Sequence, residues 1–118
     1  MIIRRQEVQT VRRLLARNPV VGIVGARQVG KTTLARYVMA GMKMPTVYFD
    51  LENPEDLARL ADPMLTLKQA RGLVVIDEVQ RLPGLFQILR VLADRARKPA
   101  RFLILGSASP ELLRQGSE

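Results

Sequence analysis

The hydrophobic positions of the chain follow two patterns that alternate from end to end. Four short runs are nearly all apolar, which is typical of buried strands: 20–24, 46–51, 72–77 and 101–106. Stretches between them place apolar residues three and four positions apart, as amphipathic helices do. Helices are expected at 4–17 and 85–98, and another begins after Gly30, with Leu34, Val38 and Met42 on one face.

Three further helix starts are indicated by capping residues followed by proline. Asn53 precedes Pro54, and Asp62 precedes Pro63, so each pair offers a side-chain cap and a proline in the first turn. Ser109 begins the same pattern near the end of the chain. Strands that alternate with helices predict a parallel α/β sandwich of three layers. Residues 1–118 contain no evident repeat or linker, so a single domain is expected.

The amino-acid composition excludes several kinds of functional site. The 118 residues include no cysteine and no histidine, which removes disulfides, thiolate metal sites and the commonest neutral-pH base. Any general acid or base would have to be a carboxylate, a lysine or water. The apolar runs are too short to span a bilayer, and the N-terminus lacks the pattern of a secretory signal. These features favour a cytoplasmic protein without a membrane partner.

Positive charge is concentrated near the N-terminus. The net charge is +8, and residues 1–45 carry nine Lys or Arg against one acid, Glu7. Such a surplus attracts polyphosphate or nucleic acid, although a solvated arginine-rich helix face is the alternative for residues 4–17. Aromatic residues make up only 4 % of the chain, which argues against base-stacking platforms.

A glycine-rich loop joins the first strand to the helix that follows it. Its sequence, GARQVGKT, matches G-x-x-x-x-G-K-[ST]. Glycines let consecutive backbone N–H groups surround an anion at the positive end of the helix. The expected nucleotide-binding residues are Gly25, Ala26, Arg27, Gln28, Val29, Gly30, Lys31, Thr32 and Thr33. Lys31 would reach the β- and γ-phosphates of ATP, Thr32 would ligate Mg²⁺, and Thr33 is placed for an α-phosphate.

Two adjacent acids, Asp77 and Glu78, end the third apolar strand. Ligands of parallel sheets bind beyond the carboxyl ends of the strands, which places this pair beside the glycine loop. Asp77 is expected to hold Mg²⁺ and Glu78 to polarise the attacking water. Ser107, after the fourth strand, is a candidate for contact with the γ-phosphate or a turn residue. Gln80 and Arg81 would face the nucleotide, a neighbouring subunit or solvent.

Together these segments resemble the N-terminal ATPase domain of a prokaryotic AAA-superfamily group of ATP-binding proteins. The resemblance rests on GARQVGKTTL, YFDLENPED, LVVIDEVQRLPGLFQILRVLAD and RFLILGSASPELLRQGSE. It implies a P-loop core of the ASCE type with strand order 2-3-4-1-5. By position in the motifs, Lys31 and Thr32 would bind phosphate and Mg²⁺, Asp77 would be the Walker B acid and Glu78 the catalytic base.

Two departures from the family pattern affect the expected activity. Many members have threonine where this chain has Leu105, so a γ-phosphate sensor would be absent or shift to Ser107. Members also continue past residue 118 through a fifth strand, arginines and a C-terminal domain. The sheet is therefore expected to have the order 2-3-4-1 with the fifth strand missing. Strand 20–24 would then be an apolar edge open to self-association or to pairing with the missing C-terminal portion. An N-terminal fragment of this kind would bind ATP and Mg²⁺ weakly and hydrolyse ATP slowly or not at all.

Three other functions stay open at the sequence level. A P-loop small-molecule kinase would need an acceptor pocket and an arginine-rich lid after the fourth strand, which the sequence does not offer. A basic nucleic-acid-binding module would use the arginines of 4–17, with salt-sensitive affinity that does not depend on Lys31. The chain could also be a remnant without activity. An ATPase core is the leading hypothesis.

Overall fold

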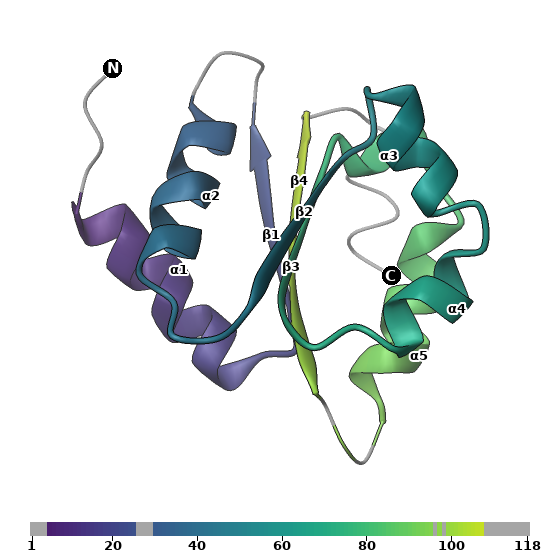
Figure 1. Ribbon diagram of the computed structural model, residues 1–118. Coiled ribbons are helices and arrows are strands. Elements are labelled where there is room, and N and C mark those ends of the chain that lie inside the picture. Colours follow the sequence, from purple (N-terminus) through teal and green to yellow (C-terminus); the bar gives the residue numbers. More distant parts are fainter. Residues whose placement is uncertain (1–4, 26–29, 96, 98, 108–118) are drawn as a thin grey trace.

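Four parallel strands form the central sheet of the computed structural model, which describes residues 5–25, 30–95, 97 and 99–107 (Figure 1). The strands are β1 (Val20–Gly25), β2 (Thr46–Asp50), β3 (Gly72–Asp77) and β4 (Ala100–Ser107). Their order across the sheet is β1-β4-β3-β2, which is the predicted 2-3-4-1 order read from the other side. Each neighbouring pair is parallel, so all four carboxyl ends lie along one edge of the sheet.

The helices form two layers, one on each face of the sheet. Figure 1 shows α1 and α2 on one side and α3, α4 and α5 on the other. Their bounds are α1 Arg5–Arg17, α2 Lys31–Ala40, α3 Pro54–Arg59, α4 Pro63–Lys68 and α5 Leu85–Ala93, with a short 3₁₀ turn, η1, at Val79–Arg81. The described residues therefore have the α/β three-layer fold that the alternating pattern predicts.

The sheet buries side chains on both faces, and β3 shows the alternation most clearly. Leu73 and Val75 pack with α1 and α2, whereas Val74 and Ile76 pack with the helices of the opposite layer. All six residues of β3 are buried. Burial of a Leu, Val or Ile side chain contributes about 1.5–3 kcal/mol, so this strand anchors both halves of the core. Its continuous apolar sequence is the expected mark of a central strand in a covered sheet.

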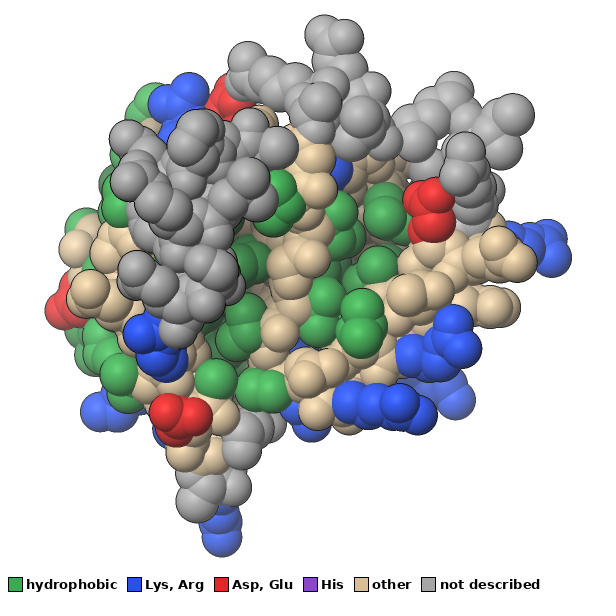
Figure 2. Space-filling view, turned by 180° about the vertical axis from the view of Figure 1, so that it is seen from behind, with side chains coloured by type: hydrophobic (Ala, Val, Ile, Leu, Met, Phe, Trp, Pro, Cys, Tyr) green, Lys and Arg blue, Asp and Glu red, His purple; other side chains and the backbone are tan. Residues whose placement is uncertain are grey.

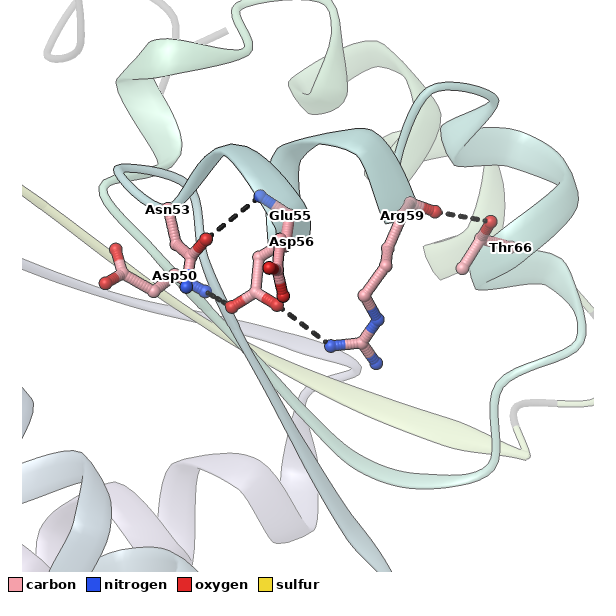
Figure 3. A network of polar contacts seen from close by, with 6 residues as sticks. All are labelled: Asp50, Asn53, Glu55, Asp56, Arg59 and Thr66. Carbon is pink, nitrogen blue, oxygen red and sulfur yellow. Dashed lines mark hydrogen bonds and ion pairs between the residues drawn. The ribbon is translucent and has the colours of Figure 1, made fainter.

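The short helices α3 and α4 begin where the sequence predicts. The Asn53 side chain accepts a hydrogen bond from the Glu55 N–H (2.9 Å), and the Asp62 side chain accepts one from the Leu65 N–H (3.3 Å). Figure 3 shows the first of these caps beside Asp56, whose carboxylate lies between the backbone of β2 and a helix side chain. Each cap satisfies a donor that the helix itself leaves unpaired.

Helix α5 is shorter than its hydrophobic pattern indicates. It ends at Ala93, not at residue 98, although Leu85, Leu89 and Leu92 are buried as expected. The side chain of Arg95 donates to the Leu92 carbonyl (3.3 Å) and to the Lys68 carbonyl (3.1 Å). These bonds close the end of α5 against the end of α4, so tertiary contact overrides the periodicity. The helix expected from residue 109 lies outside the described residues.

Helix α2 packs against the sheet with a slightly rotated face. Its buried residues are Lys31, Ala35 and Val38, whereas Leu34 and Met42 from the predicted stripe are only partly buried. Lysine is a poor choice for a buried position unless it has a role there. The burial of Lys31 therefore indicates that the start of α2 has a role other than packing against the sheet.

Strand β1 forms one end of the described sheet, since it pairs with β4 alone. Its Val24 keeps 45 % of its surface exposed. Figure 2 shows hydrophobic side chains gathered on the face seen from behind Figure 1, the side on which β1 lies. The apolar edge that the sequence predicts is thus present in this part of the chain. Within the described ranges, no helix is both long and apolar enough to cross a membrane.

Candidate functional site

The glycine loop leaves β1 at Gly25 and enters α2 at Gly30, while residues 26–29 lie outside the described residues. Gly30 caps α2 with φ 80° and ψ 24°, a left-handed conformation that favours glycine. The Lys31 side chain is 8 % exposed and its Nζ donates to the Gly25 carbonyl (3.0 Å). One charged side chain therefore bridges the two ends of the loop, at the positive end of the helix.

Asp77, the last residue of β3, lies within hydrogen-bond reach of the same helix. Its carboxylate Oδ2 accepts a hydrogen bond from Thr32 Oγ1 (2.9 Å), a contact between residues 45 positions apart in sequence. Its Oδ1 accepts the backbone N–H of Glu78 (2.9 Å). Asp77 is 7 % exposed, so the carboxylate depends on these donors for its polar contacts. Thr32 and Asp77, the two expected Mg²⁺ ligands, are adjacent in the structure.

Tyr48 joins this pair, and sequence reasoning missed it. Its hydroxyl donates to Asp77 Oδ2, and the guanidinium of Arg36 lies over its ring, 5.2 Å from the centroid. Burial and the Asp77 carboxylate both raise the pKa of Tyr48, so the phenol stays protonated and remains a donor at neutral pH. The alternation of β2 puts Tyr48 and Asp50 on one face, but only the register of β2 against β3 shows that this face meets Asp77.

Glu78 follows Asp77 in an unusual backbone conformation. Its φ of 58° and ψ of 46° are left-handed, which costs a residue with a side chain about 1–3 kcal/mol. It caps the 3₁₀ turn η1, where Gln80 Nε2 donates a hydrogen bond to Glu78 Oε2. The Gln80 Oε1 atom is buried and accepts no hydrogen bond within the described part of the chain. Strain at such a position is more common at functional sites than elsewhere.

The remaining predicted residues lie around this centre. Ser107 ends β4 directly beside Gly25 in the strand register, and it is partly exposed. Thr33 follows Thr32 in the first turn of α2 and is also partly exposed. Arg81 ends η1 and is exposed. The parallel sheet thus brings residues from β1, β3, β4 and α2 to one edge, as the sequence predicts, and adds Tyr48 from β2.

The donor set at this edge is compatible with a magnesium ion that also contacts phosphate. Mg²⁺ prefers oxygen ligands and is usually held by one or two carboxylates together with substrate phosphates. Thr32 and Asp77 supply a hydroxyl and a carboxylate within 2.9 Å of each other. No group of three or more carboxylate or imidazole side chains that could enclose a metal is found among the described residues. Thr32 and Asp77 therefore supply two oxygen ligands of the kinds that Mg²⁺ accepts.

Comparison with solved structures gives a matching fold. The P-loop NTPase domain of the sigma-54 transport activator from Escherichia coli superimposes with a TM-score of 0.60 at 24 % sequence identity. The match covers 98 % of this chain and 84 % of that domain. Since the identity is low, this similarity concerns the arrangement of the sheet and helices.

Sequence comparison identifies the family and longer relatives. Uncharacterized protein Rv2008c of Mycobacterium tuberculosis and uncharacterized protein Mb2031c of Mycobacterium bovis are each 57 % identical to this chain over all 118 residues. The chain spans only 26 % of the length of each. The model of the AAA domain family matches residues 17–118, which include both the glycine loop and the acidic pair. The chain therefore belongs to the AAA domain family and has its nucleotide-binding, ATPase-like core.

Proposed function

We propose that the chain binds ATP with Mg²⁺ and is the ATP-hydrolysing core of an AAA-type ATPase. The single observation that carries the proposal is the contact between Thr32 and Asp77 beside the buried Lys31. A hydroxyl and a carboxylate that share a hydrogen bond, next to a lysine at a helix N-terminus, offer ligands for a metal and a charge for a polyphosphate. AAA family membership supports the same conclusion.

Each residue has a separate role in the proposed site. The backbone N–H groups of the loop from Gly25 to Gly30 would surround the phosphates, and Lys31 would leave the Gly25 carbonyl to contact the β- and γ-phosphates. Thr32 and Asp77 would hold Mg²⁺, which when bound neutralises phosphate charge. Thr33 and Ser107 would contact phosphate oxygens.

Glu78 is proposed as the residue that polarises the attacking water. It immediately follows Asp77 and lies at the carboxyl edge of β3, where it could reach a water positioned for in-line attack on the γ-phosphate. Its left-handed backbone turns it away from the strand direction and into the turn η1. Glu78 would orient the water and accept its proton as the water oxygen bonds to the γ-phosphorus. The bond from that phosphorus to the bridging oxygen breaks, and ADP leaves with phosphate as the other product.

Nucleotide binding is tested by thermal shift with ATP, in the presence and absence of Mg²⁺. Wild-type protein should be stabilised by ATP with Mg²⁺, because a ligand that binds only the folded state raises its stability. Lys31→Ala should lose this shift, and Lys43→Ala, which alters an exposed lysine just beyond the same helix, should keep it. Equal shifts in the Lys31 and Lys43 variants would contradict the proposed site.

Hydrolysis is tested separately by single-turnover measurements. Glu78→Gln should keep ATP affinity and lose the chemical step, since glutamine preserves the shape of the side chain without its basicity. The Gln80 contact makes this variant informative, because glutamine at 78 can still accept a hydrogen bond from Gln80. Turnover unchanged in Glu78→Gln would remove Glu78 from the mechanism and leave nucleotide binding intact.

Nucleic-acid binding is a second candidate, favoured by the outer face of α1. Val8, Val11 and Leu15 face the core, whereas Arg5, Arg13 and Arg17 are exposed. The face therefore presents several guanidinium groups to solvent, as phosphate-contacting surfaces do. Duplex DNA affinity that falls steeply with salt and survives Lys31→Ala would support this function, and affinity that disappears in that variant would exclude it.

A further inference from the structure

We propose that Tyr48 is a positioning residue for the carboxylate of Asp77, and that it sets the affinity of the site for Mg²⁺. The inference rests on the proposed function, in which Asp77 holds the metal. Tyr48 belongs to β2, a strand that neither carries the glycine loop nor ends in the Asp77–Glu78 pair. Its role would be to fix a metal ligand and not to touch the nucleotide.

Three donors from three separate places hold the Asp77 carboxylate. Oδ1 accepts the N–H of Glu78 (2.9 Å), which follows β3 in the chain. Oδ2 accepts two hydroxyls, Thr32 Oγ1 from α2 (2.9 Å) and the phenol of Tyr48 from β2. Contacts on both oxygens fix the rotation of the carboxylate group as well as its position. The Thr32 hydroxyl and the Asp77 carboxylate are thereby oriented before any metal arrives.

The surroundings of Tyr48 explain why its ring stays in place. The register of β2 against β3 pairs Tyr48 with Val75 and puts Asp50 opposite Asp77, so the ring extends along the sheet toward the strand ends. Arg36 covers the ring at 5.2 Å from its centroid. Thr32 and Arg36 are one helical turn apart on α2, so the same helix face bonds to Asp77 and packs on Tyr48. The ring is thus held between α2 and the sheet.

The orientation of Asp77 by Tyr48 should affect the affinity for Mg²⁺ more than the affinity for the phosphates. A ligand that is already oriented loses less conformational freedom when the metal binds, and removal of an outer-shell partner typically lowers metal affinity about 10–100-fold. Without the phenol, Oδ2 keeps only the Thr32 hydroxyl, and the carboxylate can rotate about its remaining contacts. Loss of the Tyr48 hydroxyl should therefore weaken Mg²⁺ binding without a matching loss in binding of the nucleotide alone.

The test compares Tyr48→Phe with Tyr37→Phe. The chain contains only these two tyrosines, and Tyr37 is 53 % exposed on α2, so its variant removes an equivalent hydroxyl away from Asp77. ATP affinity is measured by calorimetry over a range of Mg²⁺ concentrations and again in EDTA. In Tyr48→Phe the half-saturating Mg²⁺ concentration should rise roughly tenfold, with ATP affinity in EDTA unchanged. Tyr37→Phe should behave as wild type.

The outcomes separate this proposal from the proposed function. If wild-type protein binds no ATP, the proposed function fails and the role of Tyr48 fails with it. If wild type binds ATP with Mg²⁺ and Tyr48→Phe shows the same or a lower half-saturating Mg²⁺ concentration, only the role of Tyr48 is overturned. A similar loss of ATP affinity with Mg²⁺ and in EDTA would indicate a general structural role, and would also overturn it.

A second measurement decides the question if Tyr48→Phe does not fold. The chain has no tryptophan, so in Tyr37→Phe the fluorescence of Tyr48 is observed by itself. Inorganic tripolyphosphate is used as the probe because it does not absorb where tyrosine does. Emission should change when Mg²⁺ is added with tripolyphosphate, since charge arrives beside the carboxylate that the phenol contacts, and should stay constant with tripolyphosphate in EDTA. Constant emission in both conditions would overturn the proposal.

Discussion

The side-chain amide of Gln80 donates a hydrogen bond to the carboxylate of Glu78 within the turn that follows β3. The contact occupies one oxygen of the residue that we propose as the base. It also fixes the direction of the Glu78 side chain, whose backbone is already left-handed. The structure therefore shows the Glu78 carboxylate engaged with the side chain of Gln80.

Release of this contact should change the chemical step. In Gln80→Ala the Glu78 carboxylate has both oxygens available to water, so we expect single-turnover ATP hydrolysis to rise about fivefold, the factor that corresponds to a hydrogen bond worth roughly 1 kcal/mol. ATP affinity should not change. Arg81→Ala, which alters the exposed neighbour in the same turn, is the matched control. A slower Gln80→Ala enzyme would mean that the amide holds Glu78 in its working orientation.

Gly72, at the start of β3, should not tolerate any side chain. Its φ is +80°, and a Cβ there would lie 2.2 Å from the Pro45 carbonyl oxygen, which itself accepts the Leu73 N–H (2.9 Å). Gly72→Ala should lower the free energy of unfolding by at least about 2 kcal/mol, from backbone strain together with the displaced Pro45. Urea denaturation measures it. Gly84→Ala, where an added Cβ meets nothing within 4 Å, should stay close to wild type.

The caps of the two short helices should each contribute to stability. Asn53→Ala removes the acceptor for the Glu55 N–H, and we expect a loss of about 1 kcal/mol. Asn53→Asp restores an acceptor at the same position and should recover most of the loss. Thermal denaturation of the three proteins measures the effect. A loss of equal size in both variants would show that the amide group, and not its oxygen, matters at this position.

Asp56 should make stability depend on pH in the acid range. Its carboxylate accepts the Asp50 backbone N–H (2.9 Å) and pairs with Arg59 (3.1 Å), as Figure 3 shows. The backbone hydrogen bond, followed by the Arg59 contacts, lowers the pKa of Asp56, although desolvation opposes the shift. The contribution is therefore complete above the unfolded-state pKa of about 3.9, and it is lost as pH falls through the lower folded-state pKa.

The comparison of wild type with Asp56→Asn measures this contribution. The difference in unfolding free energy between the two proteins should be constant at neutral pH and should decrease below about pH 4. The partly exposed position of Asp56 keeps the effect sensitive to salt. A difference that stays the same down to strongly acidic pH would show that the asparagine replaces the carboxylate contacts without loss.

Local sequence patterns predicted much of the fold because the strands are continuous and apolar. All four strands and the caps at Asn53 and Asp62 were predictable, since each follows from burial on both faces or from a helix start. The strand order was implied by the resemblance to the AAA-superfamily group and not by these patterns. The end of α5 was not predictable from the local pattern. The periodic apolar residues continue past Ala93, but Arg95 turns back to two carbonyls, and a contact with the end of α4 cannot be seen in a local pattern.

Some residues of the candidate site were likewise predictable from the sequence, and others were not. The glycine loop and the acidic pair each follow an apolar strand, and the carboxyl ends of parallel strands lie along one edge of a sheet, so the sequence predicts that Lys31 and Asp77 lie at the same edge. Tyr48 could not be placed there, because its contact with Asp77 depends on how β2 pairs with β3. The Gln80–Glu78 contact depends on side-chain rotation within a turn. The roles of these residues in binding and catalysis stay predictions until the variants above are measured.

The bond between Lys31 and the Gly25 carbonyl has a thermodynamic consequence for any anion that enters the loop. The Lys31 side chain is nearly buried, and one of the three N–H donors of its ammonium group already contacts a backbone oxygen. Where a phosphate takes over that donor, binding is an exchange, and the measured affinity includes the difference between phosphate and carbonyl as acceptors. Because the phosphate is charged and the carbonyl is not, the balance favours the ligand that carries more negative charge. Selectivity among nucleotides by their number of phosphates would begin at this one exchange.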